Sequence, residues 1–151
     1  MRISLKKADF LDIEFLWYLR NQPDVYKYSR KNRAASWKEH IDWILPIILG
    51  TAPKDLFVIK RGLLPIGQIR FDCLPNEKAE ISISILKEFR RKGVGLKSCK
   101  KAINLLKKTK KVKIILAEVQ KDNISSQKFF EKLKFKLKGE KVEWLEYILK
   151  L

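Results

Sequence analysis

The sequence predicts a single α+β domain over residues 1–151, with a mixed, mostly antiparallel sheet of six to seven strands flanked by about four helices. Runs at residues 2–7, 66–72 and 79–86 alternate between apolar and polar side chains, as strands do. Short turns join the middle runs, which favours an antiparallel meander. The last run leads into a helical segment and then an apolar strand, a βαβ step whose crossover is right-handed. A chain of this length buries roughly 68% of its unfolded surface.

The amino-terminal third predicts one strand and two helices. Residues 2–7 form the strand, and Asp9 or Asp12 caps a helix whose apolar residues recur at helical spacing as far as Trp17. Residues 19–24 are expected to form a loop. Ser36 and Glu39 match a capping box, in which each side chain binds the other residue's backbone NH, and start a helix that runs to about Leu49.

The middle of the chain predicts three antiparallel strands. Residues 55–60 and 66–72 form a hairpin around Arg61-Gly62, and a turn at Pro75-Asn76 leads into the third strand, residues 79–86. In that strand alternate residues face opposite sides of the sheet. The isoleucines at 81, 83 and 85 therefore face the core, and Glu80, Ser82 and Ser84 form a polar face.

The last third predicts two helices and three strands. A helix over residues 93–108 buries Cys99, Ala102, Ile103 and Leu106, and residues 112–119 form a hydrophobic strand. A short helix over residues 124–133 precedes a final hairpin of residues 135–137 and 144–151.

Composition narrows the function classes. The chain has 34 Lys and Arg against 17 Asp and Glu, a net charge of +17. Such a field attracts nucleic acid, a nucleotide cofactor, an acidic sugar nucleotide or an anionic membrane surface, and charge alone does not choose among them. Cys73, Cys99 and the single histidine suit neither a zinc site nor a disulfide framework, so no metal is expected. With no spanning run and no secretory pattern at its start, the chain is expected to be cytoplasmic.

The segment Arg90-Arg91-Lys92-Gly93-Val94-Gly95 follows a strand and opens a helix, which is typical of a phosphate-binding loop. It lacks the spacing of a Walker loop. It matches a dinucleotide fingerprint only in part, because several strands precede it and five residues separate it from its own strand. An Arg-x-x-Gly-x-Gly loop that wraps a pyrophosphate with backbone NH groups fits better.

Two segments resemble the GNAT N-acetyltransferases. Residues 83–95 resemble the acetyl-CoA-binding motif of that family, and residues 123–135 resemble its second motif. The order of elements agrees over essentially the whole chain. Segments 19–25 and 39–43 look like the branch of ribosomal-protein alanine and amino-sugar-nucleotide acetyltransferases. Segments 67–72 and 79–83 are most similar to the sugar-nucleotide group of nonulosonic-acid pathways.

The resemblance implies acetyl-CoA as cofactor and a set of residues that bind it. The strand ending at residues 83–86 would separate from its parallel neighbour, so that Ile83 and Ile85 pair through their backbones with the pantetheine amides. Phosphate oxygens would accept hydrogen bonds from backbone NH groups and contact cationic side chains. Asn123 and Ser126 would bind the cofactor arm near Phe130. The implied loop residues are Arg90, Arg91, Lys92, Gly93, Val94, Gly95, Leu96 and Lys97.

Catalysis requires a base, because a neutral amine must attack the thioester. Glu80 is the first candidate, acting through water, and Asp72, Asp42 and His40 are alternatives. Many relatives have a tyrosine as acid for the departing thiolate where this chain has Phe130. Either Tyr147 or a water would then donate the proton, or the thiolate would leave without a dedicated acid. Lys134 and Arg91 replace common glycines without affecting the match. A role for Cys73 or Cys99 as nucleophile is not expected.

The acceptor is expected to be a small-molecule amine, with a nucleotide-linked amino sugar as the first candidate. Guanidinium groups suit phosphate, indoles suit stacking, and amides suit hydroxyls. The open alternatives are a protein amino terminus, a CoA-binding protein without turnover and, remotely, a nucleic-acid-binding module. No membrane partner is expected, and the oligomeric state stays open, a dimer included. The candidate acceptor residues are Arg20, Asn21, His40, Trp43, Gln68 and Arg70.

Overall fold

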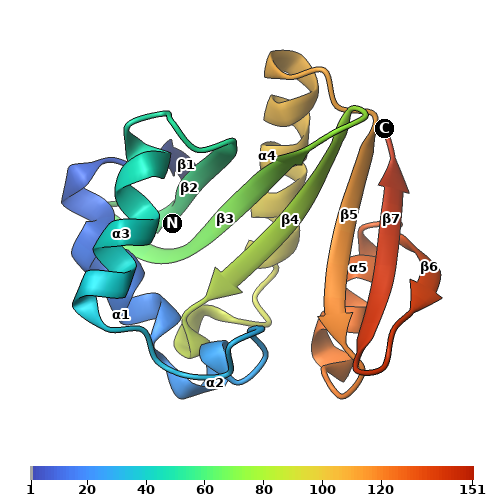
Figure 1. The fold of residues 1–151 in the computed structure, drawn as a ribbon, viewed down its shortest axis with the longest axis horizontal. Helices are drawn as coiled ribbons and strands as arrows, with labels where there is room; N and C mark the ends of the chain where they lie inside the picture. Colours follow the sequence, from blue (N-terminus) through green and yellow to red (C-terminus); the bar gives the residue numbers. More distant parts are fainter. Residues whose placement is uncertain (1) are drawn as a thin grey trace.

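A computed structural model describes residues 2–151 and contains one seven-stranded sheet (Figure 1). The strand order is β1-β2-β3-β4-β5-β7-β6, and only β4 and β5 pair in parallel. The predicted mixed, mostly antiparallel α+β fold is therefore confirmed. The strands are β1 (Ile3–Lys7), β2 (Lys54–Arg61), β3 (Leu64–Leu74), β4 (Lys78–Ile85), β5 (Ile114–Gln120), β6 (Lys136–Glu140) and β7 (Trp144–Lys150). The helices are α1 (Ile13–Arg20), α2 (Pro23–Tyr26), α3 (Trp37–Ile48), α4 (Val94–Thr109) and α5 (Ile124–Lys132), with short 3-10 turns at Phe10–Asp12 and Lys87–Phe89.

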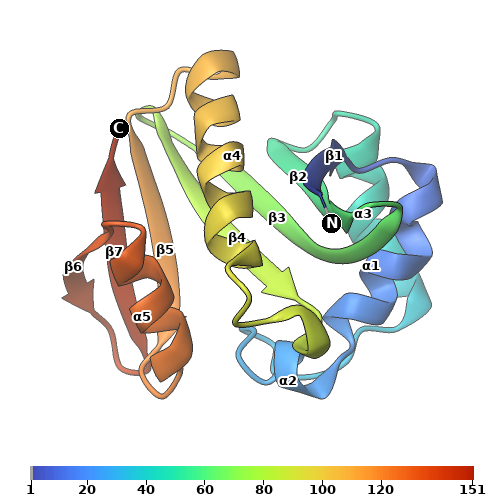
Figure 2. The same cartoon turned by 180° about the vertical axis from the view of Figure 1, so that it is seen from behind.

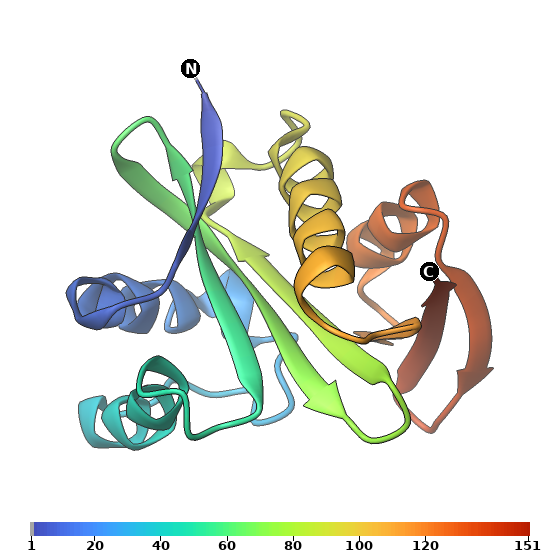
Figure 3. The same cartoon turned by 90° about the horizontal axis from the view of Figure 1, so that it is seen from above.

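The helices form two layers on opposite faces of the sheet. Helices α1, α2 and α3 lie on one face, and α4 and α5 cover the other (Figures 2 and 3). The larger hydrophobic core fills the space under α4 and α5, where Phe71, Cys99 and Ile115 are fully buried. A smaller core lies between α1, α3 and β2 around Ile44 and Val58. No helix among residues 2–151 has the length and apolar character to cross a membrane.

The amino-terminal connection differs from the expected loop at residues 19–24. Helix α1 continues to Arg20 and buries Leu19, and Pro23 starts the short helix α2, which the sequence analysis missed. Proline suits a first helical turn because its missing NH needs no partner there. Only one of the two hydrogen bonds of the predicted capping box forms at α3. The Ser36 hydroxyl accepts from the Glu39 backbone NH at 3.1 Å, but the Glu39 carboxylate binds Arg33 instead of closing the box.

The parallel strands β4 and β5 separate soon after they meet. Their pairing covers three positions and ends at Glu80 and Leu116, after which the strands diverge toward α2 and α5 (Figure 1). Leu86 donates to the Ile66 carbonyl on β3 at 2.9 Å. Because backbone groups alternate in direction along a strand, Ile83 and Ile85 turn theirs to the open side. The fold thus leaves unpaired backbone groups in the gap between the strands.

Candidate active site

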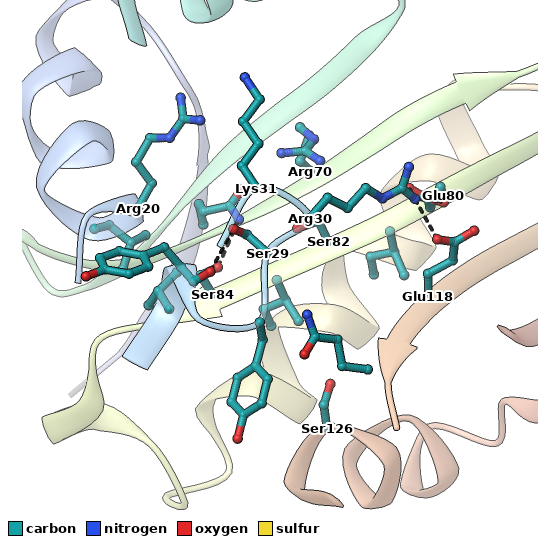
Figure 4. A pocket seen from close by; sticks show the side chains of 18 of the residues that line it. Arg20, Ser29, Arg30, Lys31, Arg70, Glu80, Ser82, Ser84, Glu118 and Ser126 are labelled. Carbon is teal, nitrogen blue, oxygen red and sulfur yellow. Dashed lines mark hydrogen bonds and ion pairs between the residues drawn. The ribbon is translucent and has the colours of Figure 1, made fainter. Parts of the chain in front are cut away.

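The polar face of β3 and β4 forms the floor of a cavity of about 500 Å³. Helices α1 to α3 and the loop at residues 27–35 cover it, and it continues through the gap between β4 and β5 to α5 (Figure 4). The cavity therefore connects the acceptor-side helices with the start of α5, where the sequence places the second motif. The side chains that line it include Arg20, Arg30, Trp43, Gln68, Arg70, Glu80, Glu118, Asn123, Ser126 and Phe130.

Two carboxylates face each other across the point where the strands separate. Glu80 lies on β4 and Glu118 on β5, and Arg30 reaches between them from the covering loop (Figure 4). The Arg30 Nη2 atom lies 2.7 Å from Glu118 Oε2 and 3.4 Å from Glu80 Oε1. The side chain of Glu80 is 23% exposed and that of Glu118 is 17% exposed, whereas the Arg30 side chain is 64% exposed. A salt bridge to so exposed an arginine contributes about 1 kcal/mol or less, so another cation can displace it.

The pKa of Glu80 is shifted in the direction that suits a general base. Burial raises the pKa of Glu80 above its usual range, Arg30 opposes this, and the neighbouring Glu118 and Asp72 add to the rise. A raised pKa brings a carboxylate closer to the operating pH of a general base. Glu118 was not among the residues that the sequence predicted for the active site. The signal that could have identified Glu118 is its position in the apolar strand β5, which runs beside the strand that carries Glu80.

The opposing effects of Arg30 and burial predict a pH shift. A general base is active as the carboxylate, so the prediction that Glu80 is this base implies that kcat/KM for the acceptor falls as the pH drops through the pKa of Glu80. Since Arg30 lowers the pKa of Glu80, Arg30→Gln should move this acidic limb to higher pH. Profiles of kcat/KM against pH test this, with Lys38→Gln as control because Lys38 pairs with the exposed Asp42 outside the cavity. An unchanged limb in Arg30→Gln would contradict the assignment to Glu80.

The alternative bases are engaged elsewhere. Burial raises the pKa of Asp72, but its ion pairs with Arg70 and Lys54 outweigh this and lower it overall. Asp42 pairs with Lys38 outside the cavity. His40 is fully buried, and its Nε2 atom lies 2.8 Å from the Ile13 carbonyl, so its ring is not available to an acceptor substrate in the cavity.

Neither cysteine is suited to nucleophilic catalysis. Burial raises the pKa of Cys99 to about 12 and also raises that of Cys73. The thiolate form that a nucleophile needs is therefore disfavoured at both positions.

The loop before α4 has the backbone geometry of a phosphate cradle. Gly93 has a φ of +76° and Arg91 has a φ of +61°, so the chain turns sharply and directs the first NH groups of α4 outward. A Cβ atom on Gly95 would lie 2.9 Å from Phe129 Cε1, so only glycine allows this approach of α4 to α5. With the backbone groups of Ile83 and the NH of Ile85 turned to the open side beside it, the site fits an extended cofactor with a pyrophosphate.

The Arg90 side chain contacts other residues of the chain, whereas the resemblance implied that it contacts phosphate. Its Nε atom donates to the Ile85 carbonyl at 2.7 Å, and its guanidinium pairs with Asp24 on α2. Arg90 therefore ties the end of β4 to the helices over the cavity, and it occupies one of the backbone acceptors expected for pantetheine. Lys92, Gly93 and Lys97 line a second hollow of about 260 Å³ beside this loop.

Helix α5 brings three expected residues to the cavity. Asn123 caps the helix, since its Oδ1 atom accepts from the Ser126 backbone NH at 3.2 Å, so this oxygen is not free for a cofactor. The Ser126 side chain lies at the cavity (Figure 4), and Phe130 follows one turn later. Tyr147, proposed as a substitute acid, is buried in the core and does not line the cavity.

Four of the six expected acceptor residues line the cavity, namely Arg20, Trp43, Gln68 and Arg70. Asn21 does not, because its side-chain amide bonds both backbone groups of Ala35 and so closes the loop. His40 does not either, because it packs behind Arg20. Both expectations were wrong, since sequence spacing does not distinguish a residue facing a cavity from one that supports its wall.

Comparison with known proteins identifies the family. The model of the acetyltransferase (GNAT) domain matches residues 2–136. No curated protein sequence matches the chain. A domain from Methanocaldococcus jannaschii has 25% identity and a TM-score of 0.86, covering 99% of both chains.

Two more distant solved structures share the fold. Spermidine N-acetyltransferase from Vibrio cholerae, in complex with CoA and spermine, has 17% identity and a TM-score of 0.88, with 98% of this chain and 95% of that chain covered. RimL, a ribosomal L7/L12 α-N-protein acetyltransferase in complex with CoA, has 16% identity and a TM-score of 0.86, with 99% and 94% covered. The match over residues 2–136, together with the separated strands and the glycine loop, shows that the chain belongs to the GNAT family of acetyl-CoA-dependent N-acetyltransferases.

Proposed function

We propose that this chain transfers the acetyl group of acetyl-CoA to a primary amine, which attacks directly in a ternary complex. The observation that carries the proposal is the guanidinium of Arg30 between Glu80 and Glu118, where the strands separate. A cation already binds at the place where a substrate ammonium would meet the cofactor. The acceptor amine would displace Arg30, at small cost because that side chain is exposed.

The residues of the gap divide the work between binding and proton transfer. The backbone groups of Ile83 and the NH groups at the start of α4 would hold the cofactor, which supplies an activated acetyl group when bound. Glu118, which makes the shorter contact to Arg30, holds the ammonium. Glu80, with its raised pKa, removes the proton directly or through one water and leaves a neutral nucleophile.

The departing thiol requires no dedicated acid in this proposal. Phe130 lines the cavity but has no proton to donate. A thiol has a pKa of about 8.5, so its anion is a tolerable leaving group that solvent can protonate. The Ser126 hydroxyl lies at the cavity one helical turn before Phe130 and would donate a hydrogen bond to the sulfur.

For the acceptor we propose a nucleotide-linked amino sugar. The cavity is large, and it combines arginines with the indoles of Trp43 and Trp144. The buried Gln68 Oε1 atom has no hydrogen-bond partner among residues 2–151 and would accept from a hydroxyl. A protein amino terminus, the substrate named for RimL, is the second candidate. With either acceptor, we propose that the protein acts in the cytoplasm and that residues 1–151 act as a single domain.

Ligand-induced stabilisation tests the cofactor site. Acetyl-CoA at 100 times its Kd should stabilise the native state by about 2.7 kcal/mol and raise the melting temperature by about 5–10 °C. Gly95→Val should lose most of this rise, measured against its own ligand-free midpoint, because its side chain would clash with Phe129 and Ile85 and disturb the first turn of α4. Gly139→Ala serves as control, since a Cβ there meets no atom within 4 Å.

Turnover tests the reaction itself. Thiol release should be measured with amino-sugar nucleotides and with amino-terminal peptides, and we expect release with the former. Stabilisation by acetyl-CoA with no release across the panel would favour a CoA-binding protein without turnover. No stabilisation at millimolar acetyl-CoA, together with tight and salt-sensitive RNA binding, would overturn the proposal in favour of a nucleic-acid-binding module.

A further inference from the structure

We propose that Arg20, Trp43 and Arg70 form an oxyanion-binding subsite that selects acceptors carrying a phosphate or carboxylate group in addition to their amine. The subsite lies in the cavity of the proposed N-acetyltransferase and rests on that function. Arg20 lies on one side of the cavity, and Glu80 and Glu118 lie on the other (Figure 4). The subsite therefore concerns the remote part of the acceptor and not the reacting amine.

Arg20 is the one cavity-lining cation without an acidic partner among residues 2–151. Five Lys and Arg line the cavity, and the other four each form an ion pair: Arg30 with Glu118, Lys31 and Arg33 with Glu39, and Arg70 with Asp72. A half-buried charge is costly unless something compensates it. The end of α1 supplies only a partial negative charge.

The acid nearest in influence does not neutralise Arg20. Glu39 favours the charged form of Arg20, but both Glu39 oxygens already accept from Arg33, each at 3.1 Å. Burial lowers the pKa of Arg20, and the positive charge of Arg70 lowers it further. A bound oxyanion would relieve both effects.

His40 fixes the orientation of the Arg20 guanidinium. The His40 Nε2 atom lies 2.8 Å from the Ile13 carbonyl, which only accepts, so Nε2 carries the proton. Nδ1 is then an acceptor, and it lies 3.3 Å from Arg20 Nη1. Burial lowers the pKa of His40, which keeps the ring in this neutral form. One edge of the guanidinium is held, and its other NH groups remain for a ligand.

Trp43 brings the two guanidinium groups to one indole. The Cζ atoms of Arg20 and Arg70 lie 5.0 Å and 5.3 Å from the centroid of the Trp43 ring. Arg70 is held in turn by Asp72, with its Nε atom 2.8 Å from Asp72 Oδ1. Each guanidinium group thus has a second contact that holds it near the same indole, and donors already in place lose little freedom when an oxyanion binds.

This arrangement gives the cavity two poles. Carboxylates at one side favour an ammonium, and an uncompensated guanidinium at the other favours an oxyanion. Acceptors with both groups should bind best, and polycations should bind poorly, because a second ammonium near Arg20 would be repelled.

Calorimetric titration of CoA-saturated protein with pyrophosphate and with malonate tests the subsite. Saturation with CoA fills the α4 loop, so that these probes report on the cavity. At least one probe should bind the wild type, and Arg20→Gln should weaken it about 10-fold or more, as expected for loss of a charged hydrogen bond. Lys31→Gln, which removes the same charge from the same cavity, should change the affinity by less than about 2-fold because that charge is exposed. Binding of neither probe to the wild type, or equal affinity in Arg20→Gln, would overturn the proposal. A preference for one probe distinguishes phosphate from carboxylate.

Positioning by His40 has its own test. His40→Leu removes the acceptor for Arg20, and His40→Gln restores one. The affinity for the probe should fall in the first variant and recover in the second, while the Kd for CoA stays unchanged in both. Equal losses in the two variants would assign His40 a structural role only.

Turnover separates this proposal from the proposed function. The ratio of kcat/KM for glucosamine 6-phosphate over glucosamine should exceed one in the wild type and fall about 10-fold in Arg20→Gln. If Arg20→Gln abolishes probe binding but no amine is acetylated, the subsite stands and the proposed function fails. If amines are acetylated and Arg20→Gln leaves the ratio unchanged, the proposed function stands and the subsite fails.

Discussion

Replacement of Glu80 by glutamine should reduce kcat/KM for the acceptor by about 10²- to 10⁴-fold, the usual contribution of a general base. Glutamine keeps the shape of the side chain but cannot accept the proton of the attacking amine. The acidic limb of the pH profile should disappear with the activity, since it reports the raised pKa of Glu80. Affinity for CoA, measured by calorimetry, should stay within about 2-fold, because Glu80 acts on the acceptor.

Glu118 should behave differently from Glu80. Glu118→Gln removes the carboxylate nearest to the Arg30 cation, so we expect mainly a higher KM for the acceptor with a smaller change in kcat. Asp42→Asn is the control, because that carboxylate is exposed on α3 and lies outside the cavity. If Glu80→Gln keeps wild-type turnover while Glu118→Gln abolishes it, the two roles are reversed.

Replacement of Gly67 by alanine should destabilise the fold by about 1–3 kcal/mol or more, the range for overpacking in a well-packed interior. A Cβ atom on Gly67 would lie 2.5 Å from the Ser84 carbonyl oxygen and 3.1 Å from Ile85 Cγ1. The first contact is with backbone in a paired strand, so β4 must shift to accommodate it. Urea denaturation of wild type and variant measures the loss, and Gly139→Ala should show almost none.

The same substitution should weaken cofactor binding, because β4 carries Ile83 and Ile85 along the edge of the gap. Displacement of β4 would move its open backbone groups relative to the α4 loop. A Gly67→Ala protein with wild-type stability would show that β3 and β4 yield more easily than the packing indicates. A destabilised variant with unchanged CoA affinity would show that the gap is insensitive to the register of β4.

Local pattern was sufficient for most of the fold and for the glycine loop before α4. Strict alternation in β3 and β4 and helical spacing in α4 indicated these elements, because period 2 and period 3.6 are read from neighbouring residues. Gly93 marked the sharp turn, because few residues other than glycine adopt its φ of +76°. Helix α2 was missed because four residues are too few to show a period.

Local pattern did not reveal which polar residues share the cavity. Glu118, Arg30 and Glu80 come from three separate segments. The parallel pairing of β4 and β5 brings the two carboxylates together, and the loop at residues 27–35 brings Arg30 between them. His40 and Asn21 showed the opposite error, since helical periodicity gives the side of a helix but not what lies against it. Arg90 turned inward because α2, whose existence the sequence did not predict, places Asp24 beside it.

The sequence by itself therefore determined the order of the strands and long helices, the glycine loop before α4 and the family resemblance, all of which depend on residues close together along the chain. The tertiary structure alone decided the carboxylate pair, the displaceable Arg30 and the unpaired charge of Arg20. These depend on contacts between distant segments and on burial, which changes the cost of a charge.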